Sequence, residues 1–119
     1  MSENVVLVKS FRFAVRVTKL YKYLKTEKAE AILSKQLLRA GTSIGANVTE
    51  AQRAQSRADF LSKMSIALKE ADETQYWLNL LYHTGYLNFA EFHSIHHDLA
   101  DILSLLTAIC KNMKYSLKK

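Results

Sequence analysis

The chain has 119 residues, a formal net charge of +6, 49% hydrophobic residues, no proline and a single cysteine. This composition excludes a disordered chain, an internal disulfide and a membrane-spanning helix, which needs about 20 consecutive apolar residues. The N-terminus also lacks the basic leader and the long apolar core of a signal peptide. We therefore expect one soluble, all-α domain over residues 1–119, located in the cytoplasm and without a membrane partner.

The first predicted helix, residues 11–25, is amphipathic and basic. Its apolar side chains recur at helical spacing on an inner face, which consists of Phe13, Val17, Leu20 and Leu24. Cations cluster on the rest of this helix with two tyrosines among them, namely Arg12, Arg16, Lys19, Lys22, Lys25, Tyr21 and Tyr23. Residues 9–39 hold nine basic and two acidic side chains, whereas residues 40–110 hold four basic and eight acidic ones. Such asymmetry is typical of a polyanion-binding face and also of an ordinary solvated helix.

The second predicted helix, residues 27–53, contains the stretch RAGTSIGANVTEAQ, whose glycines beside Thr and Ser raise the question of a phosphate-binding loop. The helical spacing of apolar residues continues through it, at Leu33, Leu37, Ala40, Ile44, Val48 and Ala51. No Lys follows the second glycine, and Gly-x-x-x-Gly matches neither a Walker loop nor a dinucleotide fingerprint. Gly41 and Gly45 therefore predict a small-residue groove on a helix, where another backbone or a bulky aromatic residue comes close.

The third predicted helix, residues 57–83, carries a heptad seam. Its members alternate in steps of four and three, at Phe60, Met64, Ala67, Ala71, Thr74, Leu78 and Leu81. Ser56 and Asp59 resemble a capping box at its start, and Gly85 stands where a left-handed helix stop belongs. These signals predict a long helix that is buried along one stripe.

The fourth predicted helix, residues 89–114, repeats this alternation. Asn88 and Glu91 form an N-cap and its reciprocal acid. The seam that follows consists of Phe92, Ile95, Leu99, Ile102, Leu106, Ile109 and Met113. This pattern predicts a helix that completes the core.

Short links near residues 25, 54 and 86 predict that neighbouring helices are antiparallel, which gives an up-down-up-down four-helix bundle. Antiparallel pairing about residue 54 brings Arg39 level with Glu70 and places Glu73 one turn away. We therefore expect Arg39 to form an ion pair with one of these acids. Trp77 lies off the main seam, so we expect it to face a partner helix instead of its own core.

Two long motifs, QLLRAGTSIGANVTEAQ and KMSIALKEADETQYWLNLL, resemble the bacterial four-helix-bundle proteins encoded by 23S rRNA intervening sequences, which also occur as free-standing chromosomal genes. The likeness runs from Phe11 to about Leu106. It implies a helical bundle that assembles into a ring-like homopentamer. A similar fold serves as the accessory protein of diversity-generating retroelements, where it is associated with nucleic acid and a reverse transcriptase.

The side chains that carry enzyme chemistry lack the partners which that chemistry needs. His93 and His97 have the spacing of a metal pair, but with His96 beside them no third or fourth ligand is evident. A di-iron centre needs Glu-x-x-His motifs, and none occurs. Cys110 lies beside the apolar seam, as a small core residue does. We therefore expect no catalytic residue, no cofactor and no metal, and a protein that is not an enzyme.

The basic residues are the remaining functional candidates. Phosphate contacts would come from Arg12, Arg16, Lys19, Lys22, Lys25, Lys111 and Lys114, with RNA favoured over DNA. Tyrosines between these cations could add base stacking. The alternative is a protein-interaction scaffold without nucleic-acid contact, whose aromatic surface at Tyr76, Trp77 and Tyr86 docks sister subunits or another protein.

Overall fold

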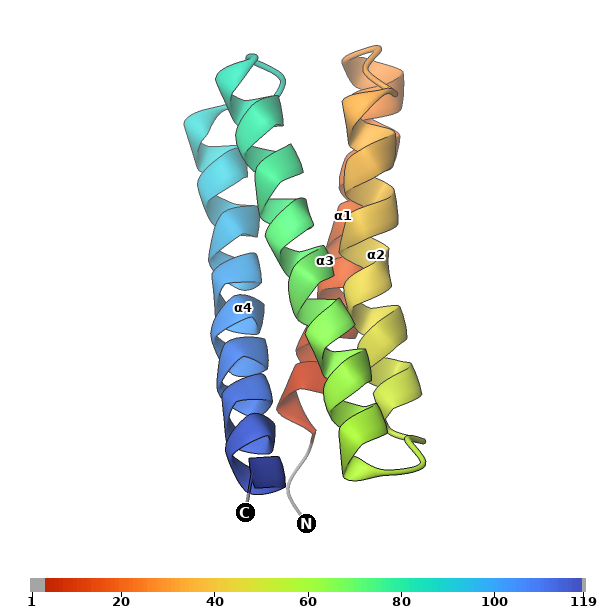
Figure 1. Cartoon of the computed structure of the whole chain (residues 1–119). Helices are drawn as coiled ribbons and strands as arrows, with labels where there is room; N and C mark the ends of the chain where they lie inside the picture. The colour runs from red at the N-terminus through yellow and green to blue at the C-terminus, as the bar shows by residue number, and fades with distance from the viewer. Residues whose placement is uncertain (1–3, 119) are drawn as a thin grey trace.

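The computed structural model describes residues 4–118 and contains four helices: α1 (Val5–Glu27), α2 (Leu33–Ala51), α3 (Arg57–His83) and α4 (Phe89–Lys118). Consecutive helices run antiparallel and pack side by side, and α4 closes the bundle against α1 (Figure 1). The predicted all-α, up-down-up-down bundle is confirmed. The α1–α2 and α3–α4 connections lie at what we call the upper end, and the α2–α3 connection, the start of α1 and the end of α4 lie at the lower end (Figure 1).

The helix boundaries differ from the prediction mainly at α1 and α2. α1 begins at Val5 instead of near residue 11, because the Asn4 side chain accepts a hydrogen bond from the Leu7 N–H at 3.2 Å and caps it. Val6, one turn before Ser10, is buried and extends the inner face of α1 to the lower end. α2 begins at Leu33, later than the predicted residue 27.

The α1–α2 connection is a tight turn over residues 28–32, a few residues after the short link predicted near residue 25. Ala29 adopts a left-handed backbone with φ of 53°, and the N–H of Glu30 donates to the Leu24 carbonyl at 2.9 Å. This geometry ends α1 as a Schellman-type turn does, with Ala where Gly is usual. The Glu30 carboxylate then accepts from the N–H groups of Ile32, Leu33 and Ser34 at 3.0, 3.0 and 2.7 Å, so Glu30 caps the start of α2.

The predicted caps of α3 and α4 are present. Ser56 accepts from the Asp59 N–H at 3.0 Å, although the Asp59 carboxylate reaches back to the N–H of Gln55 instead of that of Ser56. Asn88 and Glu91 form the full reciprocal pair, at 2.8 and 2.9 Å. Gly85 has φ of 87° and provides the left-handed stop after α3.

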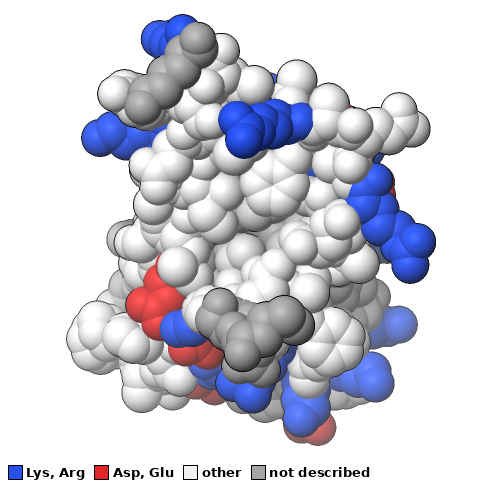
Figure 2. Space-filling model, turned by 90° about the horizontal axis from the view of Figure 1, so that it is seen from below, with Lys and Arg blue, Asp and Glu red and all other residues white. Residues whose placement is uncertain are grey.

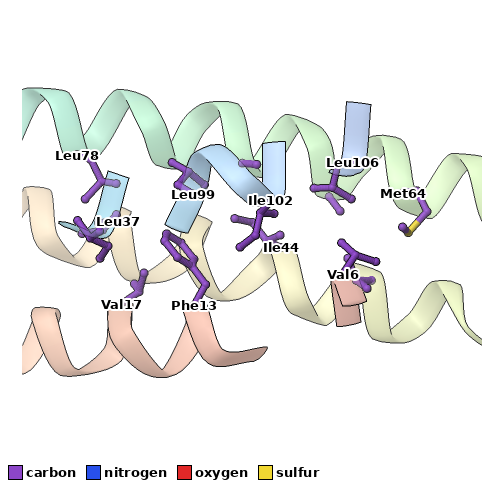
Figure 3. Close-up of a cluster of buried hydrophobic side chains, with 14 of the residues drawn as sticks. Val6, Phe13, Val17, Leu37, Ile44, Met64, Leu78, Leu99, Ile102 and Leu106 are labelled. Atoms are coloured by element: carbon purple, nitrogen blue, oxygen red, sulfur yellow. The ribbon is translucent and has the colours of Figure 1, made fainter. Parts of the chain in front are cut away.

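The four seams meet in one hydrophobic core along the bundle axis. Figure 3 shows side chains from all four helices pointing toward one another, with Phe13 of α1 inserted between Leu37, Ile44, Leu99 and Ile102. Every member of the α3 seam from Met64 to Leu81 is buried, whereas Phe60 is partly buried. Burial of each large aliphatic side chain contributes about 1.5–3 kcal/mol, which makes these seams the main stabilising feature of the fold.

The two glycines of α2 allow α1 to approach closely. A Cβ atom on Gly45 would lie 3.2 Å from the carbonyl oxygen of Ser10, so the predicted close approach of another backbone is confirmed there. A Cβ atom on Gly41 would lie 2.9 Å from both methyl carbons of Val17, which is fully buried. The neighbour of Gly41 is therefore a stiff aliphatic side chain and not an aromatic ring or a backbone.

The α1–α4 pair packs less closely than the other three neighbouring pairs. Polar contacts link these two helices, and open hollows remain between them. Within residues 4–118, no helix combines the length and the hydropathy that a membrane span requires.

Candidate nucleic-acid interface

Arg16 links α1 to α4 through contacts with Ser94 and Asp98. Its Nη1 atom lies 2.7 Å from the Asp98 carboxylate and donates to the Ser94 carbonyl at 3.2 Å, while Nη2 donates to the Ser94 hydroxyl at 3.0 Å. The guanidinium geometry suits such multiple contacts. Because Asp98 offsets its charge, Arg16 offers less attraction to a phosphate than the sequence suggested.

The lower half of α1 faces further acids of α4. Lys9 pairs with Asp101 at 3.1 Å. Arg12 is exposed and lines a hollow of about 250 Å³ together with Lys9, Asp98 and Asp101. Positive and negative charges alternate in this region, so we do not expect it to dominate polyanion binding.

Three lysines on the upper half of α1 remain exposed without an acid partner among residues 4–118: Lys19, Lys22 and Lys25. We call them the upper lysine cluster. The Nζ atom of Lys25 lies 6.0 Å from the centroid of the Tyr21 ring, at the outer limit of a cation–π contact. Tyr21 is half-buried, whereas Tyr23 is 37% exposed. Tyr23 is therefore the more accessible ring beside the cations.

The other two candidate cations lie at the opposite end of the molecule. Lys111 and Lys114 are exposed near the end of α4, at the lower end of a bundle that is 50 Å long. Figure 2 views this end and shows Lys and Arg side chains spread around its rim instead of gathered in one patch. The seven predicted residues therefore do not form a single surface, although the sequence analysis grouped them.

The predicted ion pair on α2 and α3 is present. Arg39 contacts Glu70 at 3.2 Å and also contacts Glu73, which accepts from the Trp77 indole N–H at 2.9 Å. The hydrogen bond from Trp77, followed by that from Arg39, lowers the pKa of Glu73. The hydrogen bond to Glu73 raises the pKa of Arg39. This cluster joins two helices, and it also orients the indole of Trp77.

The expectation that Trp77 faces a partner helix instead of its own core is wrong, because its side chain is partly buried against the core of its own chain. Its neighbour Tyr76 is the exposed ring, with 59% of its surface accessible. The two rings meet edge to face, with centroids 4.9 Å apart. If another protein contacts the aromatic residues of α3, Tyr76 is therefore more accessible to it than Trp77.

The histidines near the start of α4 interact with aromatic rings. His93 stacks on Phe89, and His96 stacks on Phe92 while its Nε2 lies 3.1 Å from the Gln75 side-chain nitrogen. Among residues 4–118, no three His, Cys, Asp or Glu side chains come together in a metal-binding arrangement. Cys110 is buried, as its place beside the seam predicted.

A groove between α1 and α4 at the upper end was not foreseen from the sequence. It has a volume of about 520 Å³ and is lined by Arg16, Lys19, Leu20, Tyr23, Ala90, Glu91, Ser94 and Ile95. No sequence signal places this groove, because it depends on the register of the first and last helices, in which Arg16 lies beside Ser94 and Leu20 lines the groove with Ala90.

The chain was also compared with known proteins. It matches the family model of the 23S rRNA-intervening sequence protein over residues 2–108. A crystal structure of a protein of unknown function from the S23 ribosomal protein family of Bacteroides thetaiotaomicron VPI-5482 shares 55% identity, covers 89% of this chain and 98% of its own, and gives a TM-score of 0.88. No curated protein matches the chain significantly. Neither matching description names an enzyme. This chain therefore belongs to the 23S rRNA-intervening sequence protein family.

Proposed function

We propose that this protein is a non-enzymatic, self-associating bundle of the cytoplasm that binds nucleic acid through the upper lysine cluster. The observation that carries the proposal is the exposure of Lys19, Lys22 and Lys25 without acid partners among the described residues, while Lys9 and Arg16 are paired. Unpaired cations release counterions from a phosphate backbone when they bind it, whereas paired cations must first give up an acid. We favour RNA over DNA as the ligand, and the test below compares the two.

Self-association would use two different faces of the bundle. Phe11 and Val15 on α1 are 69% and 39% exposed, and Phe11 borders a groove of about 390 Å³ beside Gly45 and Ala46 of α2. α3 lies diagonally opposite α1 (Figure 1) and exposes its own apolar residues. Contact between unlike faces generates rings or filaments, and a closed ring of five is the assembly that the family resemblance implies.

The apolar side chains that the α3 face exposes are Ile66 and Tyr76, which are 41% and 59% exposed. A ring would repeat the upper lysine cluster in every subunit, so that individually weak phosphate contacts add up to useful avidity.

The first test titrates the wild-type chain and the triple variant Lys19→Glu, Lys22→Glu, Lys25→Glu into a labelled structured rRNA fragment and a duplex DNA of equal length. Fluorescence anisotropy at several salt concentrations measures the affinity and its salt dependence. We expect the triple variant to lose roughly tenfold or more in affinity and to reduce the salt slope by about three, because each lost phosphate contact lowers the slope by about one.

The matched control is Lys111→Glu, Lys114→Glu, Lys118→Glu, which changes the net charge equally at the lower end. This control should lose clearly less affinity than the upper variant. Equal losses in both variants would mean that binding follows net charge and is not located on α1. No binding of the wild-type chain at low salt would overturn the proposed function, because electrostatic association is strongest there.

Replacing Phe11 by Ser is expected to break the assembly into monomers, because the most exposed apolar side chain of the α1 face is lost. Sedimentation velocity at micromolar concentration measures the change in size. The control is Ile32→Ser, which removes an 80% exposed apolar side chain outside both faces and should leave the size unchanged. A monomeric wild-type chain would exclude self-association, and an unchanged Phe11→Ser assembly would place the contact elsewhere.

The exposed rings also favour a second candidate function, a protein-interaction scaffold that makes no contact with nucleic acid. Phe11 and Tyr76 are the kind of accessible aromatic side chains that are enriched in protein interfaces. This alternative predicts that the wild-type chain self-associates but does not shift the anisotropy of either nucleic acid.

A further inference from the structure

The upper groove between α1 and α4 is built differently from the open lysine surface beside it. Its volume of about 520 Å³ falls within the range of small-molecule sites. Leu20 and Ile95 supply apolar surface from the two helices, and Ala90 leaves the α4 side open because its side chain is small. The groove can therefore take up a flat apolar group that the exposed lysines alone could not hold.

The two rims of this groove carry opposite charges. Lys19 is exposed on the α1 rim and has no acid partner among the described residues. Glu91 lies on the α4 rim, where one carboxylate oxygen accepts from the Asn88 N–H at 2.9 Å as part of the helix cap. An anionic group is therefore attracted to the α1 side and repelled from the α4 side.

An aromatic ring stands on the positive side of the groove. Tyr23 lies one turn after Lys19 on α1 and is 37% exposed, so part of its ring is accessible to a ligand. Arg16 closes the groove below, where its contacts with Ser94 and Asp98 hold the guanidinium in place. The groove thus offers a ring, an apolar floor and a free cation within one site.

We propose that this groove holds one unpaired base of a nucleic-acid strand, with the base against Tyr23 and the adjoining phosphate at Lys19. The inference rests on the proposed nucleic-acid binding and specifies its substrate class as unpaired strands. A nucleotide complements the groove, because its anionic phosphate matches the positive α1 rim and its flat, largely apolar base matches the apolar floor. The second oxygen of Glu91 can accept from the amino group of a base, as acidic side chains do from cytosine.

This assignment changes the expected selectivity. A duplex keeps its bases stacked and paired, so it presents only phosphates to the upper lysine cluster. A loop or a bulge can turn one base outward and add a stacking contact with a tyrosine ring. Binding should therefore depend on unpaired nucleotides and not on charge alone.

The experiment uses the full chain and two labelled RNA probes with equal numbers of phosphates, a hairpin with an unpaired loop and a fully paired duplex. Anisotropy gives the affinity of each probe for the wild type, Tyr23→Ala, Tyr23→Phe and the control Tyr115→Ala, whose tyrosine is exposed near the opposite end of α4. We expect the wild type to prefer the hairpin on the order of tenfold, and Tyr23→Ala to lose that preference while it keeps its duplex affinity. Tyr23→Phe and Tyr115→Ala should retain the preference for the hairpin. Thermal unfolding checks that each variant is folded.

Equal affinities for the hairpin and the duplex, with no effect of Tyr23→Ala, would overturn the base-binding groove and leave phosphate-led binding intact. No binding of either RNA would overturn the proposed function as well. Sedimentation velocity of the same variants tests whether a second copy of the chain occupies the groove instead. If Tyr23→Ala reduces the size of the assembly and leaves the hairpin affinity unchanged, the groove is a contact between copies of the chain and the proposal is wrong.

Discussion

Replacing Gly41 by Ala is expected to lower the free energy of unfolding by about 2 kcal/mol, although Ala favours helix formation by about 1 kcal/mol over Gly. The added Cβ atom would lie 2.9 Å from both methyl carbons of Val17. Val17 is fully buried, and its branched side chain is stiff, so it cannot turn aside. Urea unfolding followed by circular dichroism measures the change.

A double-mutant cycle tests whether Val17 is the cause. In a Val17→Ala background the same Gly41→Ala substitution should be neutral or stabilising by up to about 1 kcal/mol, because the two methyl carbons are then gone and only the Cβ atom of residue 17 remains nearby, at 3.3 Å. Ala108→Gly, at an exposed position of α4, gives the size of the helix-propensity effect without close packing. An increase in stability of Gly41→Ala in the wild-type background would show that α1 and α2 separate at little cost.

Periodicity and local capping account for the features that the sequence predicted correctly. Ser56 and Asn88 cap their helices through residues three positions away, so the contact is visible in a short stretch of sequence. The ion pair of Arg39 with Glu70 and Glu73 follows from the register of two helices joined by a short link. In each case the partners are fixed by helix geometry and one connection.

The contacts between α1 and α4 could not be predicted from the sequence, because these helices are the first and last in the chain. Their register depends on how the whole bundle closes, so the sequence did not indicate that Asp98 would offset Arg16. The same closure creates the groove beside Tyr23. The position of Lys111 at the end opposite the upper lysine cluster already follows from the predicted up-down-up-down topology, which places the end of the fourth helix beside the start of the first. A linear count of basic residues cannot separate paired cations from free ones.

The cap that Glu30 forms at the start of α2 was not predicted, for a different reason. The predicted second helix began at residue 27 and so included Glu30, although its apolar spacing begins only at Leu33. Glu is also not a preferred residue at a helix start, where Ser, Thr, Asp and Asn lead. The left-handed turn at Ala29 brings the longer side chain within reach of three N–H groups, which a list of propensities does not anticipate.

Replacing Glu30 by Ala is accordingly expected to lower the free energy of unfolding at neutral pH by about 2 kcal/mol. The first N–H groups of α2 would lose their acceptor, and the carboxylate would no longer stabilise the positive end of the helix dipole. Glu30→Gln keeps an oxygen acceptor without the charge, so its loss should be smaller. Urea unfolding of both variants beside the wild type gives the two differences.

The dependence of these differences on pH identifies the charge of Glu30 as the cause. Burial raises the pKa of Glu30, but hydrogen bonds from the N–H groups of Leu33, Ser34 and Ile32 outweigh it, so the folded-state pKa lies below the ordinary value of 4.5. The contribution of the carboxylate is therefore fully present above the pKa of the unfolded state and is lost as the pH falls through the folded pKa. The gap in stability between wild type and Glu30→Gln should narrow from pH 7 to about pH 3. Because both chains keep Glu73, whose pKa is also lowered, its loss of stability in acid cancels in the comparison. A gap that stays constant over this range would assign the role of Glu30 to packing instead of charge.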